Sequence, residues 1–185
     1  MSFGLLCVFV MPFFLAITYR VVFNTDKNLQ ILQLIGQVVV GALLFSVAAP
    51  LIGACVHLLA SFAFPQGMSS ELSFFKKNTG IVLLGAYAFF GVPAFFTGLV
   101  AGSLVPFLKS WRQCFVIGLI SLPISVLWSS AISNPRGSSL LATLHWIADN
   151  PISRLDPITP LGIFVSSILL SRVLCKRPSQ ETHPN

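Results

Sequence analysis

The charged residues of this chain are kept apart from its long apolar stretches. All 11 Lys and Arg residues and all 5 Asp and Glu residues lie outside these stretches or at their ends. The stretches cover residues 3–19, 38–64, 80–108, 114–133 and 158–175. Because a helix needs about 20 apolar residues to cross about 30 Å of hydrocarbon, this segregation predicts an integral membrane protein.

The same stretches predict the fold class. Inside hydrocarbon every backbone N–H and C=O must be paired, and runs without alternating polarity favour helices over the strands of a barrel. We therefore expect an all-α, polytopic helical bundle with five transmembrane helices, forming one domain over residues 1–175. Four helices remain if the short first stretch does not span. Residues 176–185 are polar and contain two prolines, which predicts a disordered tail.

Composition and charge exclude several other classes of protein. Charged residues make up only 9% of the chain and the mean hydropathy is +0.88, whereas soluble domains carry about 25% charged residues. The net charge of +6 is spread singly or in pairs over the loops and the tail. This pattern is typical of membrane anchoring, so the lipid bilayer is the expected partner and nucleic acid is not.

The distribution of Lys and Arg predicts an orientation. With the N-terminus outside, the cytoplasmic side would carry seven of these residues and the outer side four. The first group is Arg20, Lys27, Lys109, Arg112, Arg172, Lys176 and Arg177, and the second is Lys76, Lys77, Arg136 and Arg154. Because cytoplasmic loops carry the excess of positive charge, we expect the N-terminus outside and the C-terminus in the cytoplasm.

Two segments are expected to be interfacial helices. Residues 29–64 are apolar almost throughout, and one helix of that length would measure about 54 Å, which is too long for a bilayer. The three glutamines of Leu29–Gln37 share a face, so this segment is expected to lie in the interface and to turn into the membrane near Val38. Leu140–Ala148 has apolar residues at helical spacing, which predicts a short in-plane or re-entrant helix on the outer side.

Each of the first four stretches contains an internal proline. These are Pro12, Pro50, Pro93 and Pro123. A proline removes one backbone hydrogen bond from a helix and frees a carbonyl that neighbours, serines or water must satisfy. Kinked helices allow cavities to form, although proline is also common in membrane helices that have only a structural role.

Residues 91–102 form the most distinctive local sequence, Gly-Val-Pro-Ala-Phe-Phe-Thr-Gly-Leu-Val-Ala-Gly. We expect helix breaks at Pro50 and at Gly91–Pro93. Ala94, Gly98 and Gly102 then recur at intervals of four, a spacing that lets another helix approach closely while Thr97 hydrogen-bonds across the contact. The alternative is a broken helix that presents its N-terminal amides to an anion at the centre of the membrane, but no cationic side chain accompanies it in the stretch.

The segment Gly-x-Pro-Ala-x-x-Thr-Gly, residues 91–98, resembles a signature of small polytopic inner-membrane proteins of Gram-negative bacteria. The resemblance covers about a dozen residues. It implies a bacterial inner membrane. Such families have no assigned activity, so the resemblance implies no chemistry.

His57 is the ionisable residue that lies well inside a stretch. It falls on the same helical face as Ala49, Gly53 and Ser61, which are spaced by four, so it is expected to face other helices. An ionisable group in that position is a functional hypothesis, and His57 and Thr97 are the candidate binding residues. The alternative for His57 is a neutral imidazole that hydrogen-bonds to a serine or a carbonyl near the outer end of its helix.

The acidic residues that some kinds of catalysis require do not occur in the stretches. No Asp or Glu lies inside any of them, which argues against a carboxylate proton relay or an intramembrane aspartyl protease. The four cysteines are isolated in the sequence and lack the paired spacing of a metal site or a disulfide framework. We therefore expect no catalytic residue, no metal and no cofactor.

Three hypotheses about function follow. The sequence favours a non-catalytic accessory, scaffolding or assembly subunit, whose small-residue stripes at Ala49/Gly53 and Ala94/Gly98/Gly102 pack against itself or a larger membrane protein. The second is a small channel or facilitator with kinked helices around His57 and Thr97, in which Ser121, Ser125 and Ser129 line a pore or satisfy freed carbonyls. The third is a lipid-modifying enzyme acting at the outer loop, where Asp149, Arg154 and Asp156 lie.

Overall fold

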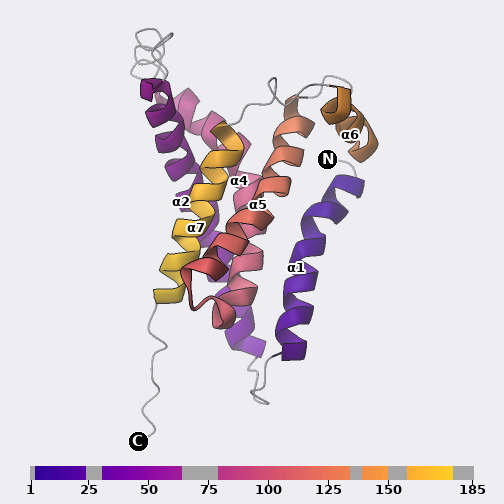
Figure 1. Ribbon diagram of the computed structural model, residues 1–185, viewed down its shortest axis with the longest axis vertical. Helices are drawn as coiled ribbons and strands as arrows, with labels where there is room; N and C mark the ends of the chain where they lie inside the picture. The colour runs from indigo at the N-terminus through magenta and orange to yellow at the C-terminus, as the bar shows by residue number, and fades with distance from the viewer. Residues whose placement is uncertain (1–2, 24–30, 64–78, 134–138, 150–157, 177–185) are drawn as a thin grey trace, which may run out of the picture.

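The structure is a computed structural model, and it describes residues 3–23, 31–63, 79–133, 139–149 and 158–176. Every regular element in these ranges is a helix (Figure 1). The elements are α1 (Phe3–Phe23), α2 (Ile31–Ala63), α4 (Thr79–Leu104), the short 3₁₀ helix η2 (Val105–Phe107), α5 (Trp111–Ser133), α6 (Leu140–Asp149) and α7 (Ile158–Lys176). The expected all-α membrane bundle is confirmed. The expected polar tail falls outside the described residues from position 177 onward.

Four of these helices are long and apolar enough to cross a membrane. Their candidate spans are Leu6–Phe23, Ile31–Val56, Leu84–Phe107 and Trp111–Ile132, and a shorter apolar helix covers Pro160–Cys175. The first apolar stretch therefore forms a helix of spanning length, and α1 continues past its expected end at Tyr19 to include Arg20. Pro106 ends α4 at the same end of the bundle, because η2 replaces the last turn expected there.

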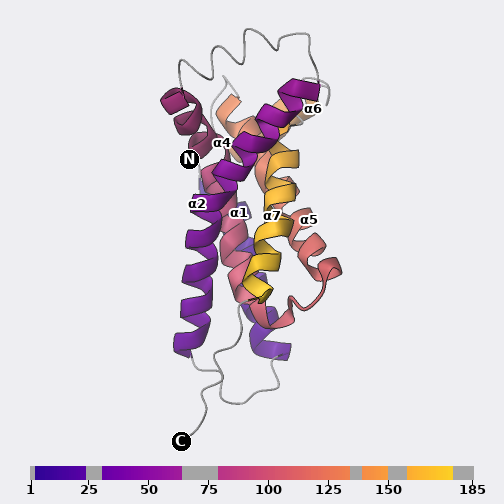
Figure 2. The same cartoon turned by 90° about the vertical axis from the view of Figure 1, so that its left-hand side faces the viewer.

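The expected turn near Val38 is wrong, because α2 is one continuous helix of 33 residues. No proline interrupts it before Pro50, and α4 packs against the segment that was expected to turn. A Cβ atom added at Gly102 would lie 2.8 Å from the Cα atom of Val38, so this part of α2 is held against α4. Figure 2 shows how the length is accommodated: the lower half of α2 is upright and its upper half leans across the bundle.

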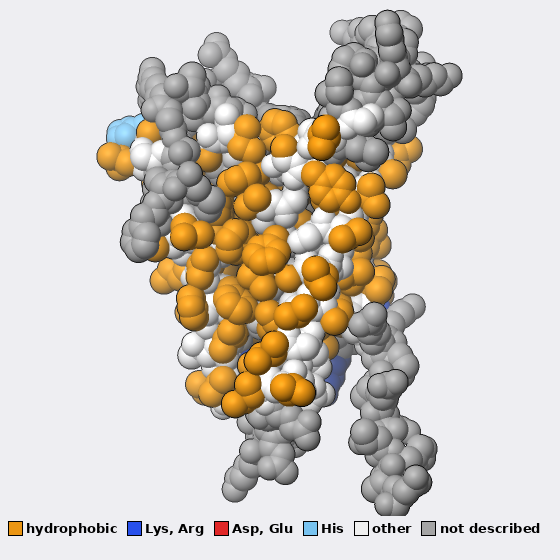
Figure 3. All heavy atoms as spheres, turned by 180° about the vertical axis from the view of Figure 1, so that it is seen from behind, with side chains coloured by type: hydrophobic (Ala, Val, Ile, Leu, Met, Phe, Trp, Pro, Cys, Tyr) orange, Lys and Arg blue, Asp and Glu red, His pale blue; other side chains and the backbone are white. Residues whose placement is uncertain are grey.

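The antiparallel pair α2 and α4 forms the centre of the bundle. Helix α7 packs against both of them, α5 packs against α7 and α4, and α1 stands at the edge, mainly against α4 (Figure 1). The buried core between these helices contains Phe45, Ala49, Ala94, Val100, Ala101, Ile117, Leu170 and Leu174. Hydrophobic side chains cover the outer face as well, and Lys or Arg side chains appear near its lower edge (Figure 3). This arrangement suits a bundle whose solvent is lipid.

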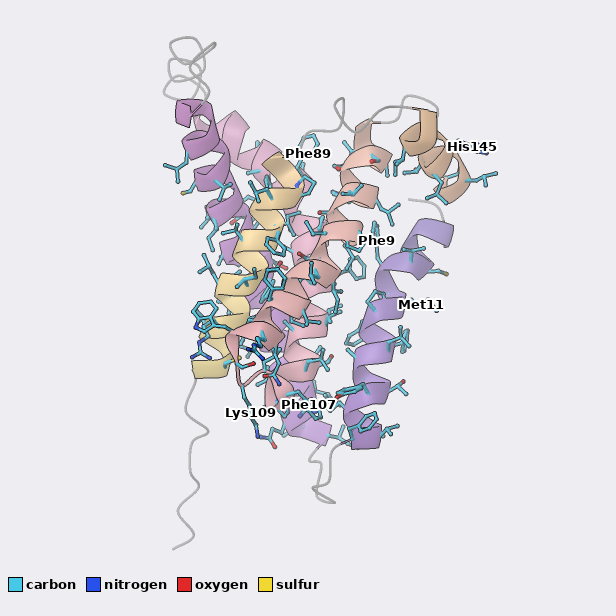
Figure 4. All side chains as sticks on the ribbon, viewed as in Figure 1. Phe9, Met11, Phe89, Phe107, Lys109 and His145 are labelled. Carbon is cyan, nitrogen blue, oxygen red and sulfur yellow. The ribbon has the colours of Figure 1, made fainter. Side chains whose placement is uncertain are left out.

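Helix α6 corresponds to the short helix expected at residues 140–148. The Ser139 hydroxyl accepts a hydrogen bond from the Ala142 N–H at 3.1 Å and so caps its first turn. Thr143 is buried on the side that packs against α5, whereas Leu141 and Leu144 are exposed. His145 points away from the bundle (Figure 4). The helix is therefore amphipathic and lies at the end of the bundle where α1 begins.

Candidate functional site

The backbones of α2 and α4 touch at a seam of three glycines. A Cβ atom added at Gly98 would lie 2.5 Å from the Gly41 carbonyl oxygen, and one added at Gly41 would lie 2.5 Å from the Gly98 carbonyl oxygen. One added at Gly102 would lie 2.6 Å from the Gln37 carbonyl oxygen. Contact this close needs residues without a side chain. The Ala94/Gly98/Gly102 stripe therefore packs inside the chain, with Ala94 fully buried beside it.

A second close contact joins α2, α4 and α7. Cβ atoms added at Gly53 of α2 and at Gly162 of α7 would lie 2.5 Å and 2.9 Å from the Phe90 ring of α4. Ala49 is buried one turn below Gly53. Sequence reasoning missed Gly41 and Gly162 as contact residues. A signal for Gly41 existed, because the spacing of four that joins Ala49 and Gly53 extends backwards through Phe45 to Gly41.

The helix breaks expected at Pro50 and at Gly91–Pro93 do not occur. Both α2 and α4 continue through these residues, so no half-helix offers its amides to an anion. Each proline leaves the carbonyl four residues before it without a helical N–H donor. Aromatic side chains of neighbouring helices donate hydrogen bonds to the carbonyls that are adjacent to these in the sequence. The Tyr87 hydroxyl donates to the Val47 oxygen at 3.2 Å, and the Trp128 indole donates to the Ala88 oxygen at 3.0 Å.

The hydroxyl groups proposed for a pore bond mostly to their own helices. Thr97 is fully buried and donates to the Pro93 oxygen at 2.8 Å, within α4 and not across the seam. The three serines on one face of α5 do the same. Ser121 donates to Gly118, Ser125 to Leu122 and Ser129 to Val126, at 2.6, 2.8 and 3.1 Å. Each of these hydroxyls therefore donates its proton within its own helix.

Several other buried polar atoms have no hydrogen-bond partner among the residues that the structure describes. They are Ser46, Ser130, Ser167 and Ser171 Oγ, Gln37 Oε1, and the Nε atoms of Arg20 and Arg172. The side chain of His57 lies outside the described residues, although α2 runs through that position. The side chains of Asp149, Arg154 and Asp156 also lie outside them. The roles expected for His57 and for this outer loop therefore stay predictions.

Arg20 is the most deeply buried charged side chain that the structure describes, with 3% of its surface exposed. It lies in the last turn of α1, and its Nη1 donates a hydrogen bond to the Ser103 oxygen at 3.2 Å. Ser103 belongs to the last turn of α4, where carbonyls lack partners within the helix and the helix dipole is negative. A cation at this point caps α4. The sequence had placed Arg20 in a connecting loop.

Trp111 lies at the same end of the bundle, with Arg172 over its ring and two basic residues beside it in the sequence. The guanidinium carbon of Arg172 in α7 lies 5.3 Å from the centre of the Trp111 ring, and its Nη1 donates a long hydrogen bond of 3.5 Å to the Lys109 oxygen. Lys109 and Arg112 are exposed, and Lys109 projects beyond the bundle (Figure 4). We refer to Lys109, Trp111, Arg112 and Arg172 as the Trp111 cluster. Sequence reasoning counted these charges but did not bring them together.

The structure also changes the description of the cysteines. Cys114 at the start of α5 and Cys175 at the end of α7 are near enough for their thiols to interact, although they are 61 residues apart in the sequence. Cys7 and Cys55 are exposed. Among the described residues, no three His, Cys, Asp or Glu side chains gather to hold a metal ion. Comparison with protein-family models, with curated proteins and with solved structures gives no match for this chain.

Proposed function

We propose that this protein is a non-catalytic accessory or assembly subunit that binds a larger membrane protein through α1. The observation that carries the proposal is the unequal burial of the spans. Only 17% of the residues in the Leu6–Phe23 span of α1 are buried, against 56% in the Leu84–Phe107 span of α4. A spanning helix that its own bundle covers so little keeps most of its surface available for a partner.

The attachment of α1 is confined to one side. The centre of the Phe9 ring lies 5.5 Å from that of the Phe96 ring and 6.1 Å from that of the Trp128 ring. The ring centres of Tyr19 and Phe107 are 5.2 Å apart. The large side chains of Met11, Phe14 and Leu15 are exposed elsewhere on the helix. Helices associate in lipid through packing and hydrogen bonds. The exposed side of α1 offers aromatic and branched side chains for such packing.

The small-residue stripes have a different role from the one that the sequence favoured. Gly98, Gly102 and Gly53 are enclosed between helices of this chain, so they stabilise the bundle and are not free for a partner. The accessory hypothesis therefore depends on α1 and not on the glycines. The channel hypothesis keeps one observation in its favour, the unpaired buried hydroxyls of Ser46, Ser167 and Ser171, and a flux measurement tests it.

The proposed location is a bacterial inner membrane, with the N-terminus outside and the C-terminus in the cytoplasm. The resemblance of residues 91–98 supports the membrane. The charges support the orientation, because Arg20, Lys109, Arg112 and Arg172 all lie at the end where α1 and α7 finish and α2 and α5 begin (Figure 1). Positive charge collects on the cytoplasmic side of membrane proteins. Labelling of a cysteine added at either terminus in intact cells tests this orientation.

Photo-crosslinking in the native cells tests the partner. A benzophenone amino acid is placed at Phe14 of α1 or, as the matched control, at Leu43 of α2, because both side chains are 61% exposed. We expect a discrete protein adduct from position 14 and none from position 43. Absence of an adduct at position 14, or the same adducts from both positions, contradicts the proposal. An adduct of twice the protein's mass replaces the larger partner with a second copy of this chain.

Reconstitution provides the second measurement. Vesicles that contain only this protein are expected to pass small polar solutes and ions no faster than empty vesicles. Flux that disappears in Ser167→Val and Ser171→Val variants would favour the channel hypothesis over the accessory role.

A further inference from the structure

We propose that the Trp111 cluster and the exposed apolar side chains next to it on α5 bind an anionic phospholipid. The phosphate would lie among Lys109, Arg112 and Arg172, and an acyl chain would lie along Trp111, Phe115 and Leu119. This site is on α5 and α7, away from the exposed side of α1, and it does not depend on the proposed partner.

The charge of the cluster favours an anion. Lys109 and Arg112 are 3 residues apart, on either side of the first residue of α5, and Arg172 joins them from near the end of α7. The sequence has no Asp or Glu between Glu71 and Asp149 or between Asp156 and Glu181, so neither helix supplies a carboxylate near these cations. Basic residues at the cytoplasmic ends of spanning helices attract anionic headgroups.

The cluster is held in place before any ligand arrives. The Gln113 side-chain oxygen accepts hydrogen bonds from the backbone N–H of Ser110 at 2.8 Å and of Lys109 at 2.6 Å. Ser110 and Gln113 have the spacing of a capping box, which fixes the start of α5. Arg172 lies over the Trp111 ring, with its guanidinium carbon 5.3 Å from the ring centre. The contact with the indole therefore orients the guanidinium before a ligand binds.

A line of exposed apolar side chains leads from the cluster into the hydrocarbon region. Trp111, Phe115 and Leu119 recur at intervals of four along α5 and are 55%, 47% and 47% exposed. Phe115 packs edge-on against Phe164 of α7, with ring centres 5.2 Å apart. A Cβ atom added at Gly118 would lie 2.9 Å from both Phe164 and Ile168, so the two helices are closely joined behind this line.

The combination of the two features identifies a lipid as the ligand. Trp at the end of a spanning helix lies at the level of the headgroups, and cations there reach the phosphates while apolar side chains of the next turns meet the acyl chains. A soluble anion would use the cations alone. An anionic phospholipid uses the cations and the apolar line together, and phosphatidylglycerol is a suitable probe.

Fluorescence quenching by brominated lipids tests the site on the full chain in vesicles. Phosphatidylglycerol or phosphatidylcholine with brominated acyl chains is mixed with unbrominated lipid, and the contribution of Trp111 is obtained by subtracting the signal of the Trp111→Phe variant. About fivefold preference for phosphatidylglycerol is expected for each cation that contacts the phosphate, which gives between about fivefold and about 100-fold at low salt. The preference should fall in 0.5 M salt, because screening weakens it.

Variants and controls decide the outcome. The exposed Arg112→Gln change should lower the preference about fivefold, and Lys109→Gln/Arg112→Gln/Arg172→Gln should abolish it. Lys76→Gln/Lys77→Gln is the control, because it removes two positive charges from the segment between α2 and α4 in the sequence. Equal quenching by the two lipids in the natural protein, or an equal loss in the control, overturns the proposal. Glycerol 3-phosphate at the same concentration should not displace the lipid, and displacement would show that a soluble anion suffices.

Discussion

Arg20 of α1 and Ser103 of α4 are joined by a hydrogen bond of 3.2 Å across 83 residues of sequence. The bond places a buried guanidinium on the last turn of α4, where the freed carbonyls and the helix dipole favour a positive charge. It also ties the least buried span of the bundle to the most buried one. The edge helix is therefore held at this end by a polar contact and further along by the aromatic contacts of Phe9.

Replacement of Arg20 should loosen α1. Arg20→Met keeps much of the side-chain volume but leaves the Ser103 oxygen without its donor, so we expect a loss of about 1.5–3 kcal/mol, the range for hydrogen bonds to charged groups. The exposed Arg112→Met change should cost much less. Unfolding in mixed micelles measures both. Equal stability of Arg20→Met and the natural protein would mean that the cap contributes nothing.

The glycines of α4 should differ sharply in their tolerance of a methyl group. Gly98→Ala puts a Cβ atom 2.5 Å from a backbone oxygen, and because neither backbone can yield without moving a helix, we expect a loss of at least about 2 kcal/mol. Gly91→Ala meets nothing within 4 Å and should be neutral or stabilising by about 0.5–1 kcal/mol. Thermal unfolding in one detergent compares them directly. Similar melting temperatures for the two variants would contradict the backbone contact.

The aromatic donors near the proline sites should each contribute modestly. Trp128→Phe and Tyr87→Phe remove the hydrogen bonds to Ala88 and Val47, and hydrogen bonds between membrane helices are worth about 0.6–2 kcal/mol. Trp128 also contacts Phe9, so its variant should lose more stability than the Tyr87 variant. Chemical unfolding of the single and double variants measures the two losses. The reverse order would mean that the indole is not anchored as described.

The proximity of Cys114 and Cys175 can be tested by oxidation. In a background with Cys7→Ser and Cys55→Ser, copper–phenanthroline and oxygen should remove two hydrogen atoms from the thiols and form an intramolecular disulfide. Mass spectrometry after proteolysis detects the linked peptides, and the Cys114→Ser variant serves as the control. Linked peptides that appear only in dimers would show that the two cysteines belong to different molecules.

The stripe on α4 shows what spacing alone could predict. The repeat of Ala94, Gly98 and Gly102 indicated a close helix contact, and a close contact exists at these residues. The sequence did not identify the helix on the other side. The partner helix is α2, because the backbone of Gly41 contacts Gly98. This contact forms because α2 and α4 pack antiparallel along much of their length.

Val38 and Pro93 show where local reasoning failed. The length of the apolar segment 29–64 favoured a turn near Val38, and the proline ring favoured a helix break at Pro93. Both α2 and α4 nevertheless continue through these residues. Contacts with neighbouring helices override these local preferences: Gly102 of α4 packs against Val38 of α2, and Trp128 of α5 donates a hydrogen bond to the Ala88 oxygen of α4. Such contacts join residues that no sequence window contains together.

The separation of charge from apolar residues by itself determined that the chain is a membrane bundle of helices, because hydrocarbon permits few alternatives for an unpaired backbone. Tertiary structure alone decided which groups the buried and half-buried arginines contact. Arg20 reaches the end of α4, and Arg172 reaches Trp111, because several helices end at the same side of the bundle. The physical reason is that the free energy of moving a segment from water into lipid depends on the composition of that segment alone. The neighbours of a side chain depend on how helices that are far apart in the sequence pack together.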